Sequence, residues 1–413
     1  MSIVSPPQLK TPPRIERLRV KNFRVLRDVE LKNLTPFTVL LGPNGSGKSS
    51  VFDVFAFLAE CFEGGLRQAW EKRGRGSELK SRGGVGPVMI EVGYRERPDT
   101  PLITYHLEVD EQDHNPVVVT EWLRWKRGSH TAPFKFLNNT DGIVQVISRA
   151  RPEKDDRLVE FSLSSPDTLA ANALGQSSQN PLIVALRNFI LGWYFSHFSS
   201  SEVRDQATAE PQAQLNETGG NLANVIQYLS DLYPELLGSI VGKLWQRVPK
   251  FQSVQAVQIP DGRLLLQFKD IPFAEPVMAR FVSDGTLKML AYLVLLHSPA
   301  PPSFIGIEEP ENYLHPRLLY GLGEECRNAA NATQVLVTTH SPFFLDSLRP
   351  KEVRVLWRDD TGYTQCRSLD QNDKVKAFLD AGALLGDLWM EGHFEVEDFQ
   401  HRGTVPMRNG NGH

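Results

Sequence analysis

Four residues near the start of the chain have the types and the spacing that are needed to hold phosphate groups. They are Gly42, Gly47, Lys48 and Ser49, in the pattern G-x-x-x-x-G-K-S. Glycines let the backbone curl so that successive N–H groups point at phosphate oxygens, and a helix that begins here adds the positive end of its dipole. The lysine reaches the terminal phosphates, and the serine hydroxyl can bind Mg²⁺. The motif predicts a site for a nucleoside triphosphate.

The sequence on both sides of this motif supplies the strand and the helix that a phosphate loop requires. The apolar run TVLL precedes it, and SVFDVFAFLAEC follows it with helical length. This context favours a nucleotide site over the alternative, a glycine-rich surface loop. The residues expected to bind the nucleotide are Gly42, Pro43, Asn44, Gly45, Ser46, Gly47, Lys48, Ser49 and Ser50.

Two adjacent carboxylates follow a second short apolar run. The run FIGI ends in Glu308 and Glu309, at the carboxyl edge of a predicted buried sheet, where doubly wound folds bind their ligands. One carboxylate at this edge can hold Mg²⁺ through water, and its neighbour can accept a proton from an attacking water. We assign the metal role to Glu308, together with Ser49, and the role of general base to Glu309. The alternative is an acidic turn after a strand.

This second region also resembles a known family. FIGIEEPE, followed by NYLHP and by THS at residues 339–341, resembles the ATPase head of the ABC superfamily in its RecF, SMC and OLD-like branch. By this resemblance, His340 matches the switch histidine that contacts the γ-phosphate, and residues 312–315 match the loop that crosses the dimer interface. The segment VKNFRVL resembles the one that borders the adenine. Within the branch, the chain is similar to bacterial AAA-type predicted ATPases that stand alone, without a fused nuclease.

The family's signature motif also has a counterpart, directly before a predicted helix. It consists of Ser283, Asp284, Gly285 and Thr286. In this family the signature completes the site of a second subunit, so the resemblance implies a homodimer that clamps two ATP molecules with Mg²⁺. ATP then closes the dimer and hydrolysis opens it. The catalytic residues implied are Lys48, Glu309 and His340.

Three features depart from the family pattern. Glu308 stands where most P-loop enzymes carry aspartate, which lengthens the reach by one methylene group and could slow hydrolysis. The signature is S-D-G-T in place of S-G-G-Q, so Ser283 and Gly285 are stronger candidates for phosphate contacts than Asp284. No glutamine has a clear context for the family's glutamine loop.

Hydrophobic patterns elsewhere predict the elements that must position these residues. From Phe281 onward the chain alternates helix and strand in the rhythm of a parallel sheet, and residues 87–163 contain β-rich runs typical of an antiparallel sheet. Residues 14–34 and 254–268 have the pattern of hairpins, and residues 67–82 that of a mobile basic loop. Helices are expected at residues 182–198, 221–245, 286–297, 318–330 and 374–391.

The predicted fold is an α/β P-loop NTPase of ABC-ATPase type. It has a parallel-sheet core, with an antiparallel β lobe and a helical lobe inserted between the Walker A motif and the signature. The predicted divisions are a disordered leader (1–13), the first part of the ATPase core (14–85), the β lobe (86–165), the helical lobe with a hairpin (166–280), the second part of the core (281–370), and a C-terminal helix with a disordered tail (371–413).

Length and composition limit the class of protein. A chain of 413 residues can hold two or three domains, and a net charge of −4 excludes a polycation, so DNA contact would need a local basic patch. Three separated cysteines argue for a reducing compartment and against a zinc site. No apolar run is long enough to span a bilayer, and the proline-rich start lacks a signal-peptide core. We therefore predict a cytoplasmic protein without a membrane partner.

These features lead to one main hypothesis and two alternatives. The main hypothesis is a dimeric ATPase that acts in DNA repair or in defence against phages and plasmids and drives a separately encoded effector, such as a nuclease. The chain lacks heptads for coiled-coil arms and has no acidic nuclease cluster after His340. DNA contact is left open and rests on basic stretches at residues 14–27, 67–82 and 149–157. The alternatives are an ATP-dependent scaffold with little turnover and the nucleotide-binding subunit of a membrane transporter.

Overall fold

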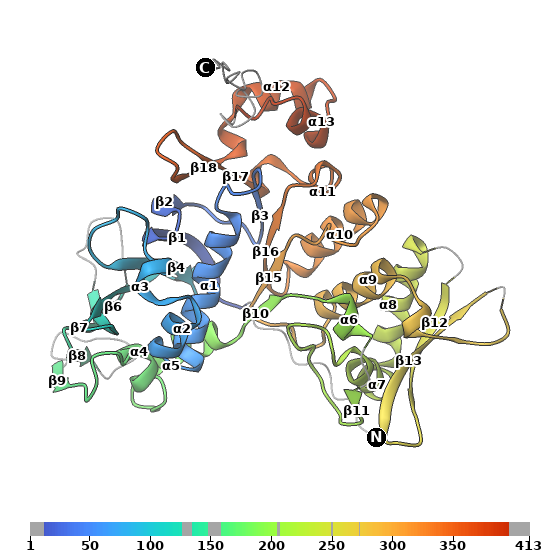
Figure 1. Cartoon of the computed structure of the whole chain (residues 1–413), viewed down its shortest axis with the longest axis horizontal. Coiled ribbons are helices and arrows are strands. Elements are labelled where there is room, and N and C mark those ends of the chain that lie inside the picture. Colours follow the sequence, from blue (N-terminus) through green and yellow to red (C-terminus); the bar gives the residue numbers. More distant parts are fainter. Residues whose placement is uncertain are drawn as a thin grey trace, which may run out of the picture.

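A parallel sheet lies at the centre of the computed structural model, which describes residues 12–125, 134–147, 158–204, 207–248, 251–271 and 273–395. Within these residues the sheet has six strands, and only the last pair is antiparallel. Figure 1 shows it between two lobes. Its order is β10 (Trp193–Ser196), β15 (Phe304–Glu308), β16 (Gln334–Thr339), β3 (Phe37–Leu41), β17 (Val353–Arg358) and β18 (Thr364–Ser368).

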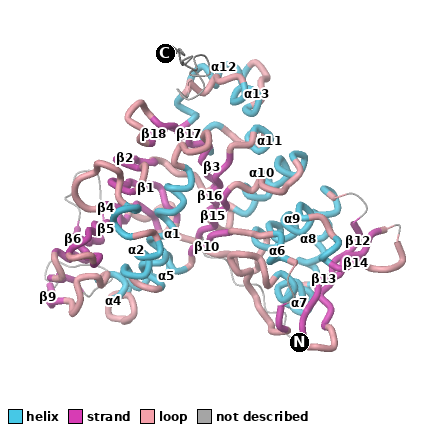
Figure 2. The backbone as a smooth tube through the Cα atoms, in the orientation of Figure 1, coloured by secondary structure: helices cyan, strands magenta, loops and turns pink. Residues whose placement is uncertain are grey.

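Both faces of this sheet are buried, which explains its unbroken apolar sequence. Along β3, Val39 and Leu41 belong to one hydrophobic core and Leu40 belongs to the other. In β15, Phe52 packs over Gly306, where a Cβ would lie 2.8 Å from the phenyl ring. Strands buried on both sides are typical of parallel sheets covered by helices. Figure 2 shows helices on both sides of the central strands.

An antiparallel sheet forms the lobe that covers one face. The hairpin predicted at residues 14–34 is confirmed, and its strands continue the sheet that was predicted for residues 87–163. Within the described residues the order is β2 (Leu26–Leu31), β1 (Arg14–Phe23), β4 (Val88–Arg95), β5 (Ile103–Gln112), β6 (Asn115–Trp125), β7 (Phe134–Thr140), β8 (Ile143–Ile147) and β9 (Leu158–Ser162).

The helices on this side fill the space between the two sheets. Phe55 and Phe57 of α1 (Lys48–Glu63) are buried there, and Phe57 packs near Trp70. The basic loop predicted at residues 67–82 is wrong, because α2 (Leu66–Lys72) and α3 (Arg75–Leu79) occupy it, with Trp70 buried and Arg73 paired to acids of α1. The remaining helices here are α4 (Ala170–Leu174) and α5 (Pro181–Leu191).

The single helix predicted at residues 182–198 is also wrong. Helix α5 ends before Gly192, and the next four residues form β10, whose backbone pairs in parallel with β15. The predicted helices at 221–245 and 374–391 are each two helices. Pro234 begins the second helix of the first pair, and Gly382, with a φ of 92°, separates the second pair. The terminal segments 1–11 and 396–413 lie outside the described residues.

The other lobe covers the opposite face with helices and a small sheet. The hairpin predicted at residues 254–268 is confirmed. The small sheet contains β11 (Ala207–Thr208), β12 (Phe251–Gln258), β13 (Arg263–Asp270) and β14 (Val277–Met278). The helices are α6 (Ser200–Val203), α7 (Leu222–Leu232), α8 (Pro234–Arg247), α9 (Asp284–Leu296) and α10 (Pro316–Ala329), followed towards the C-terminus by α11 (Pro342–Leu345), α12 (Asp373–Asp380) and α13 (Leu385–Met390). No helix in the described ranges is both long and apolar enough to cross a bilayer.

A buried carboxylate ties three helices of this lobe together. Glu325 of α10 lies 2.9 Å from Lys243 and 2.7 Å from Arg247, both on α8, and 2.9 Å from His297 at the end of α9. Burial alone would raise the pKa of Glu325. Hydrogen bonds from His297 and Lys243, together with the nearby charges of Lys243 and Arg247, outweigh burial and lower it to about 2.

We predict that Glu325→Gln lowers the free energy of unfolding at pH 7 by about 3 kcal/mol, because it leaves buried cations without their anion. The folded pKa lies below the unfolded value near 4.5, so the carboxylate stabilises the fold above that pH and loses its contribution as the pH falls towards 2. The difference in free energy of unfolding between the parent and the variant, measured by urea denaturation, should therefore become smaller between pH 5 and pH 3. Glu324→Gln, at an exposed neighbour, is the control. A deficit that does not change with pH would contradict this role.

Candidate nucleotide site

The phosphate loop lies between β3 and α1, as the sequence predicts. The Lys48 ammonium donates hydrogen bonds to the carbonyls of Gly42 at 2.7 Å and Pro43 at 3.1 Å, so the side chain curls back over the loop. Gly45 and Gly47 have φ values of 82° and 104°, in the region that favours glycine. The loop is therefore already curled around the lysine.

The β17–β18 hairpin packs against this loop. The Thr364 hydroxyl of β18 donates to the carbonyl of Ser46 at 2.8 Å. A Cβ on Gly47 would lie 2.2 Å from that hydroxyl oxygen, and one on Gly42 would lie 2.3 Å from the carbonyl oxygen of Leu356 in β17. Both glycines are therefore needed for close packing, and Gly47 is needed for its backbone conformation as well.

The catalytic candidates meet at the carboxyl edge of the sheet. Glu309 lines the same hollow of about 130 Å³ as Asn44, Gly45, Gly47, Lys48, Ser49 and Ser50. Its φ is 41°, and its N–H donates to both the carbonyl and the hydroxyl of Thr338 on β16. Glu308, the last residue of β15, is half-buried beside Thr338 in the sheet register. The structure thus brings Lys48, Ser49 and Glu309 together.

The charges at this edge are coupled. Burial lowers the pKa of Lys48, and the carboxylates of Glu309, Glu311 and Glu308 act against that shift. Lys48 is 4% exposed, and these acids, together with the loop carbonyls, offset part of the cost of burying its charge. A bound phosphate would take over the same electrostatic role.

Glu311 is the last residue of the EEPE motif, and no role was predicted for it from the sequence. It lies beside His340. One oxygen, Oε1, accepts hydrogen bonds from the Thr339 hydroxyl and from the His340 N–H, both at 2.8 Å. The same oxygen lies 3.2 Å from His340 Nδ1, while Glu309 Oε1 lies 3.7 Å from it. Glu311 therefore orients the histidine. The contacts that give Glu311 this role form only in the folded chain. Its position two residues after Glu309 was the one sign in the sequence that it lies near the site.

The signature residues lie away from this hollow. Ser283 caps α9, and its hydroxyl accepts a hydrogen bond from the Thr286 N–H at 3.2 Å. Asp284 forms an ion pair with Arg204 at 2.6 Å, which leaves it poorly suited to contact a phosphate. A Cβ on Gly285 would lie 3.0 Å from the carbonyl oxygen of Tyr313. None of these residues is among those that line the phosphate-loop hollow.

Helix α9 is nevertheless joined to the loop after Glu309. The Lys288 ammonium donates to the carbonyl of Asn312 at 2.8 Å, and burial lowers the pKa of Lys288 to about 8. Asn312 in turn donates to Glu309 Oε2 at 3.2 Å. Phe281 and Tyr313 beside this connection are 69% and 73% exposed, so an apolar surface borders the signature.

A further hollow of about 400 Å³ adjoins the phosphate loop. It shares Val25 and Arg358 with the smaller hollow and extends past Arg24 and Tyr363. Sequence reasoning missed Arg358, because β17 lies far along the chain and reaches the loop only through sheet pairing with β3. Together the two hollows offer space for phosphates and for the rest of a nucleotide.

The residues present fit a magnesium ion that is shared with phosphate groups. Ser49 is exposed at the hollow, and Glu309, which lines the same hollow, supplies a hard oxygen donor; Glu308 is its neighbour in the chain and is not among the lining residues. The buried hydroxyl of Ser46 has no hydrogen-bond partner among the described residues. In the same part of the chain, no cluster of three or more metal-binding side chains is present. Magnesium would therefore need phosphate oxygens to complete its ligands.

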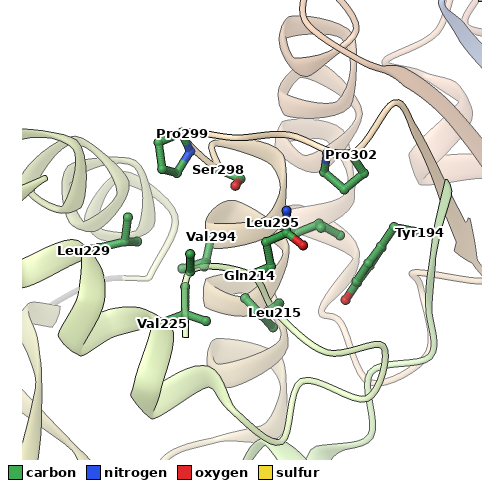
Figure 3. Close-up of a pocket in the computed structure, with 11 residues that line it drawn as sticks. Tyr194, Gln214, Leu215, Val225, Leu229, Val294, Leu295, Ser298, Pro299 and Pro302 are labelled. Atoms are coloured by element: carbon green, nitrogen blue, oxygen red, sulfur yellow. The ribbon is translucent and has the colours of Figure 1, made fainter. Parts of the chain in front are cut away.

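A separate small hollow has no such chemistry. Figure 3 shows Val225 and Leu229 of α7 near Val294 and Leu295 of α9, with Tyr194 at the other end. Its volume is about 20 Å³, which is room for about one water molecule. We regard it as a packing gap in the core.

Much of the basic charge suggested for DNA contact is paired with acids. Arg19 and Lys21 both lie near Asp28, and Arg24 lies 3.0 Å from Asp53. In the second stretch, Arg73 is paired with Asp53 and with a further acid of α1. The third stretch lies outside the described residues. The described strands therefore present less free positive charge than the sequence suggests.

A family match covers most of the chain. Residues 37–117 and 128–346 match the family described as "AAA domain, putative AbiEii toxin, Type IV TA system". The uncharacterized protein MJECL10 of Methanocaldococcus jannaschii is 36% identical over 50 residues, which are 12% of this chain and 23% of that protein. This match therefore spans less than a quarter of the relative.

Two solved structures of Smc heads resemble the fold. One is the Smc head bound to the C-winged helix domain of ScpA, with 14% identity, a TM-score of 0.52, and coverage of 87% of this chain and 99% of the other. The second is the Smc head domain with an extended coiled coil, bound to the C-terminal domain of ScpA derived from Pyrococcus furiosus. It has 13% identity, a TM-score of 0.52, and coverage of 89% and 100%. At such identity the likeness concerns the fold alone.

We predict that Gly47→Ala destabilises the chain more than Gly45→Ala. Both positions have positive φ, which costs an alanine about 1 kcal/mol. At Gly47 the new Cβ would also collide with Thr364, whereas nothing lies within 4 Å of a Cβ at Gly45. Denaturation in urea should give a loss about 1–2 kcal/mol larger for Gly47→Ala. Equal losses would show that the contact with Thr364 does not constrain the loop.

Proposed function

This chain belongs to the AAA-domain family named above, and from that premise we propose that it is an ATP-hydrolysing dimeric switch that drives a separately encoded effector. The resemblance to ABC-type ATPase heads is confirmed at the level of family and fold. Hydrolysis, dimerisation and the effector are the proposed part. The observation that carries the proposal is the position of Glu309, whose carboxylate lines the hollow that Lys48 and Ser49 also line.

In the proposed reaction, the chain's own residues bind ATP and activate water. Lys48 exchanges the carbonyls of Gly42 and Pro43 for phosphate oxygens, and Glu309 accepts a proton from the attacking water. His340, held by Glu311, contacts the terminal phosphate. Mg²⁺ held by Ser49 and Glu308 would neutralise phosphate charge.

A dimer explains why the signature lies outside its own hollow. Ser283 begins α9, whose N-terminus can stabilise phosphate charge, yet among the described residues the signature does not line the phosphate-loop hollow. We propose that it completes the site of a second copy, with the exposed Phe281 and Tyr313 at the interface. ATP then favours the closed dimer, and hydrolysis releases it.

We place this switch in DNA repair or in defence against phages and plasmids, in the cytoplasm. The family description names a type IV toxin–antitoxin system, which supports the defence role and a separate protein partner. DNA remains a candidate trigger. ATP hydrolysis and mass in solution should be measured together, with and without double-stranded DNA. Turnover with ATP-dependent dimerisation would support the switch, whereas dimerisation with negligible turnover would favour the scaffold.

We predict that Glu309→Gln keeps ATP binding, lowers the hydrolysis rate at least about 100-fold and accumulates a dimer, because the amide cannot accept the proton. Lys48→Ala should lose binding and turnover together. Glu324→Gln, an exposed change on α10, is the control and should hydrolyse at the parent rate. If Glu309→Gln hydrolysed ATP at the parent rate, Glu309 would not be the general base.

We further predict that two inactive variants restore activity when they are mixed. Ser283→Arg blocks the signature and Lys48→Ala blocks the phosphate loop, so a mixed dimer has one site in which both are intact. Statistical mixing of independent sites should recover about a quarter of the parent rate. Each variant alone is the baseline. If the mixture recovers nothing although mass measurements detect mixed dimers, the signature does not act across subunits.

A further inference from the structure

The largest of the hollows described here lies at the β17–β18 hairpin, at the far end of β17 from the phosphate loop. Its volume is about 490 Å³, within the range of small-molecule sites. Figure 1 shows β2 near β17 and β18, and the hollow is lined by residues that follow β2 and by residues of both other strands. It shares no residue with the hollows at the nucleotide site.

A buried arginine faces this hollow. Arg354 is 3% exposed, and its guanidinium donates to the carbonyls of Lys32, Asn33, Lys351 and Val353. Its Nε atom has no hydrogen-bond partner among the described residues, and the carboxylate whose charge acts on this guanidinium is that of Asp370. Burial lowers the pKa of this guanidinium. A buried cation with carbonyl partners alone is costly unless an anion balances it.

The other charged residues give the hollow a positive excess. Lys32, Lys351 and Arg367 line it with Arg354, against Glu30 and Asp370. Arg367 also lies 3.8 Å from Glu395, so four cations face three carboxylates. Glu30, one of these acids, is already shared between Lys32 and Arg17. The remaining positive excess favours an anion, and a phosphate monoester carries a charge of about −2 at pH 7.

We propose that this hollow binds a small phosphorylated ligand of nucleotide size through Arg354, Lys351 and Lys32. The ammonium groups of Lys32 and Lys351 would hold the phosphate, and the buried charge of Arg354, whose one unpartnered donor is Nε–H, would attract it. Glu30 and Asp370 at the wall can accept hydrogen bonds from sugar hydroxyls. A recessed site of this size favours a small ligand over a nucleic-acid strand. The nearby Arg19 and Lys21, which a strand would need, are neutralised by Asp28.

The test uses the full chain with Lys48→Ala, so that the phosphate loop does not contribute. Inorganic phosphate, 5′-AMP and a single-stranded oligonucleotide are titrated separately by calorimetry at constant ionic strength. We expect saturable binding of 5′-AMP and weaker binding of phosphate. Adding Lys32→Glu and Lys351→Glu should weaken 5′-AMP at least about tenfold, since each replaces an exposed cation with an anion.

Lys374→Glu, at an exposed lysine of α12 that does not line the hollow, is the matched control and should leave the affinity within about twofold. Circular dichroism of each variant verifies folding. The proposal is overturned if neither phosphate nor 5′-AMP binds, if the control weakens binding equally, or if only the oligonucleotide binds. These outcomes do not depend on ATP hydrolysis, so this proposal and the proposed function can fail separately.

Discussion

Strands β3, β15 and β16 expose no face to water, because alternate residues pack into two separate hydrophobic cores. Charged groups are too costly to bury along such strands, so they can occur only where the strands end. Lys48 follows the loop after β3, Glu309 follows β15, and His340 follows β16. Parallel pairing brings these three ends to one edge. Burial of the sheet therefore decides where the chemistry lies.

The packing below the phosphate loop adds a second constraint. Thr364 and Leu356 approach the loop so closely that only glycine fits at positions 47 and 42. The loop is thus supported by a hairpin that lies more than 300 residues further along the chain, and contacts within the chain fix its shape. Lys48 is held by loop carbonyls in the place where it would meet phosphate oxygens. A preformed site of this kind avoids part of the entropic cost of ordering on binding.

The sequence predicted the parts of this site that depend on neighbours in the chain. The strand, loop and helix around Lys48 are contiguous, and Glu308 and Glu309 directly follow a recognisable apolar run, so a local pattern suffices. Other parts depend on tertiary contacts. Arg358 and Thr364 reach the loop only because β17 pairs with β3, and no local signal shows this. The segment that forms β10 was predicted as helix because its apolar residues fit both structures, and pairing with β15 decides between them.

Ion pairing is likewise not predictable from a local stretch of sequence. Residues 14–27 are rich in arginine and lysine, but antiparallel pairing of β1 with β2 and β4 sets acids directly beside them. Arg17 lies 2.8 Å from Glu91 of β4, and Asp28 of β2 lies near both Arg19 and Lys21. A phosphate backbone gains from cations that are free to release counterions, and cations already paired with carboxylates provide less of this gain. Around Arg354 the fold brings together cations from separate segments, of which Lys32 is paired with Glu30 and Arg367 with Glu395. The net charge of a surface therefore depends on strand pairing, which a count of basic residues in the sequence does not show.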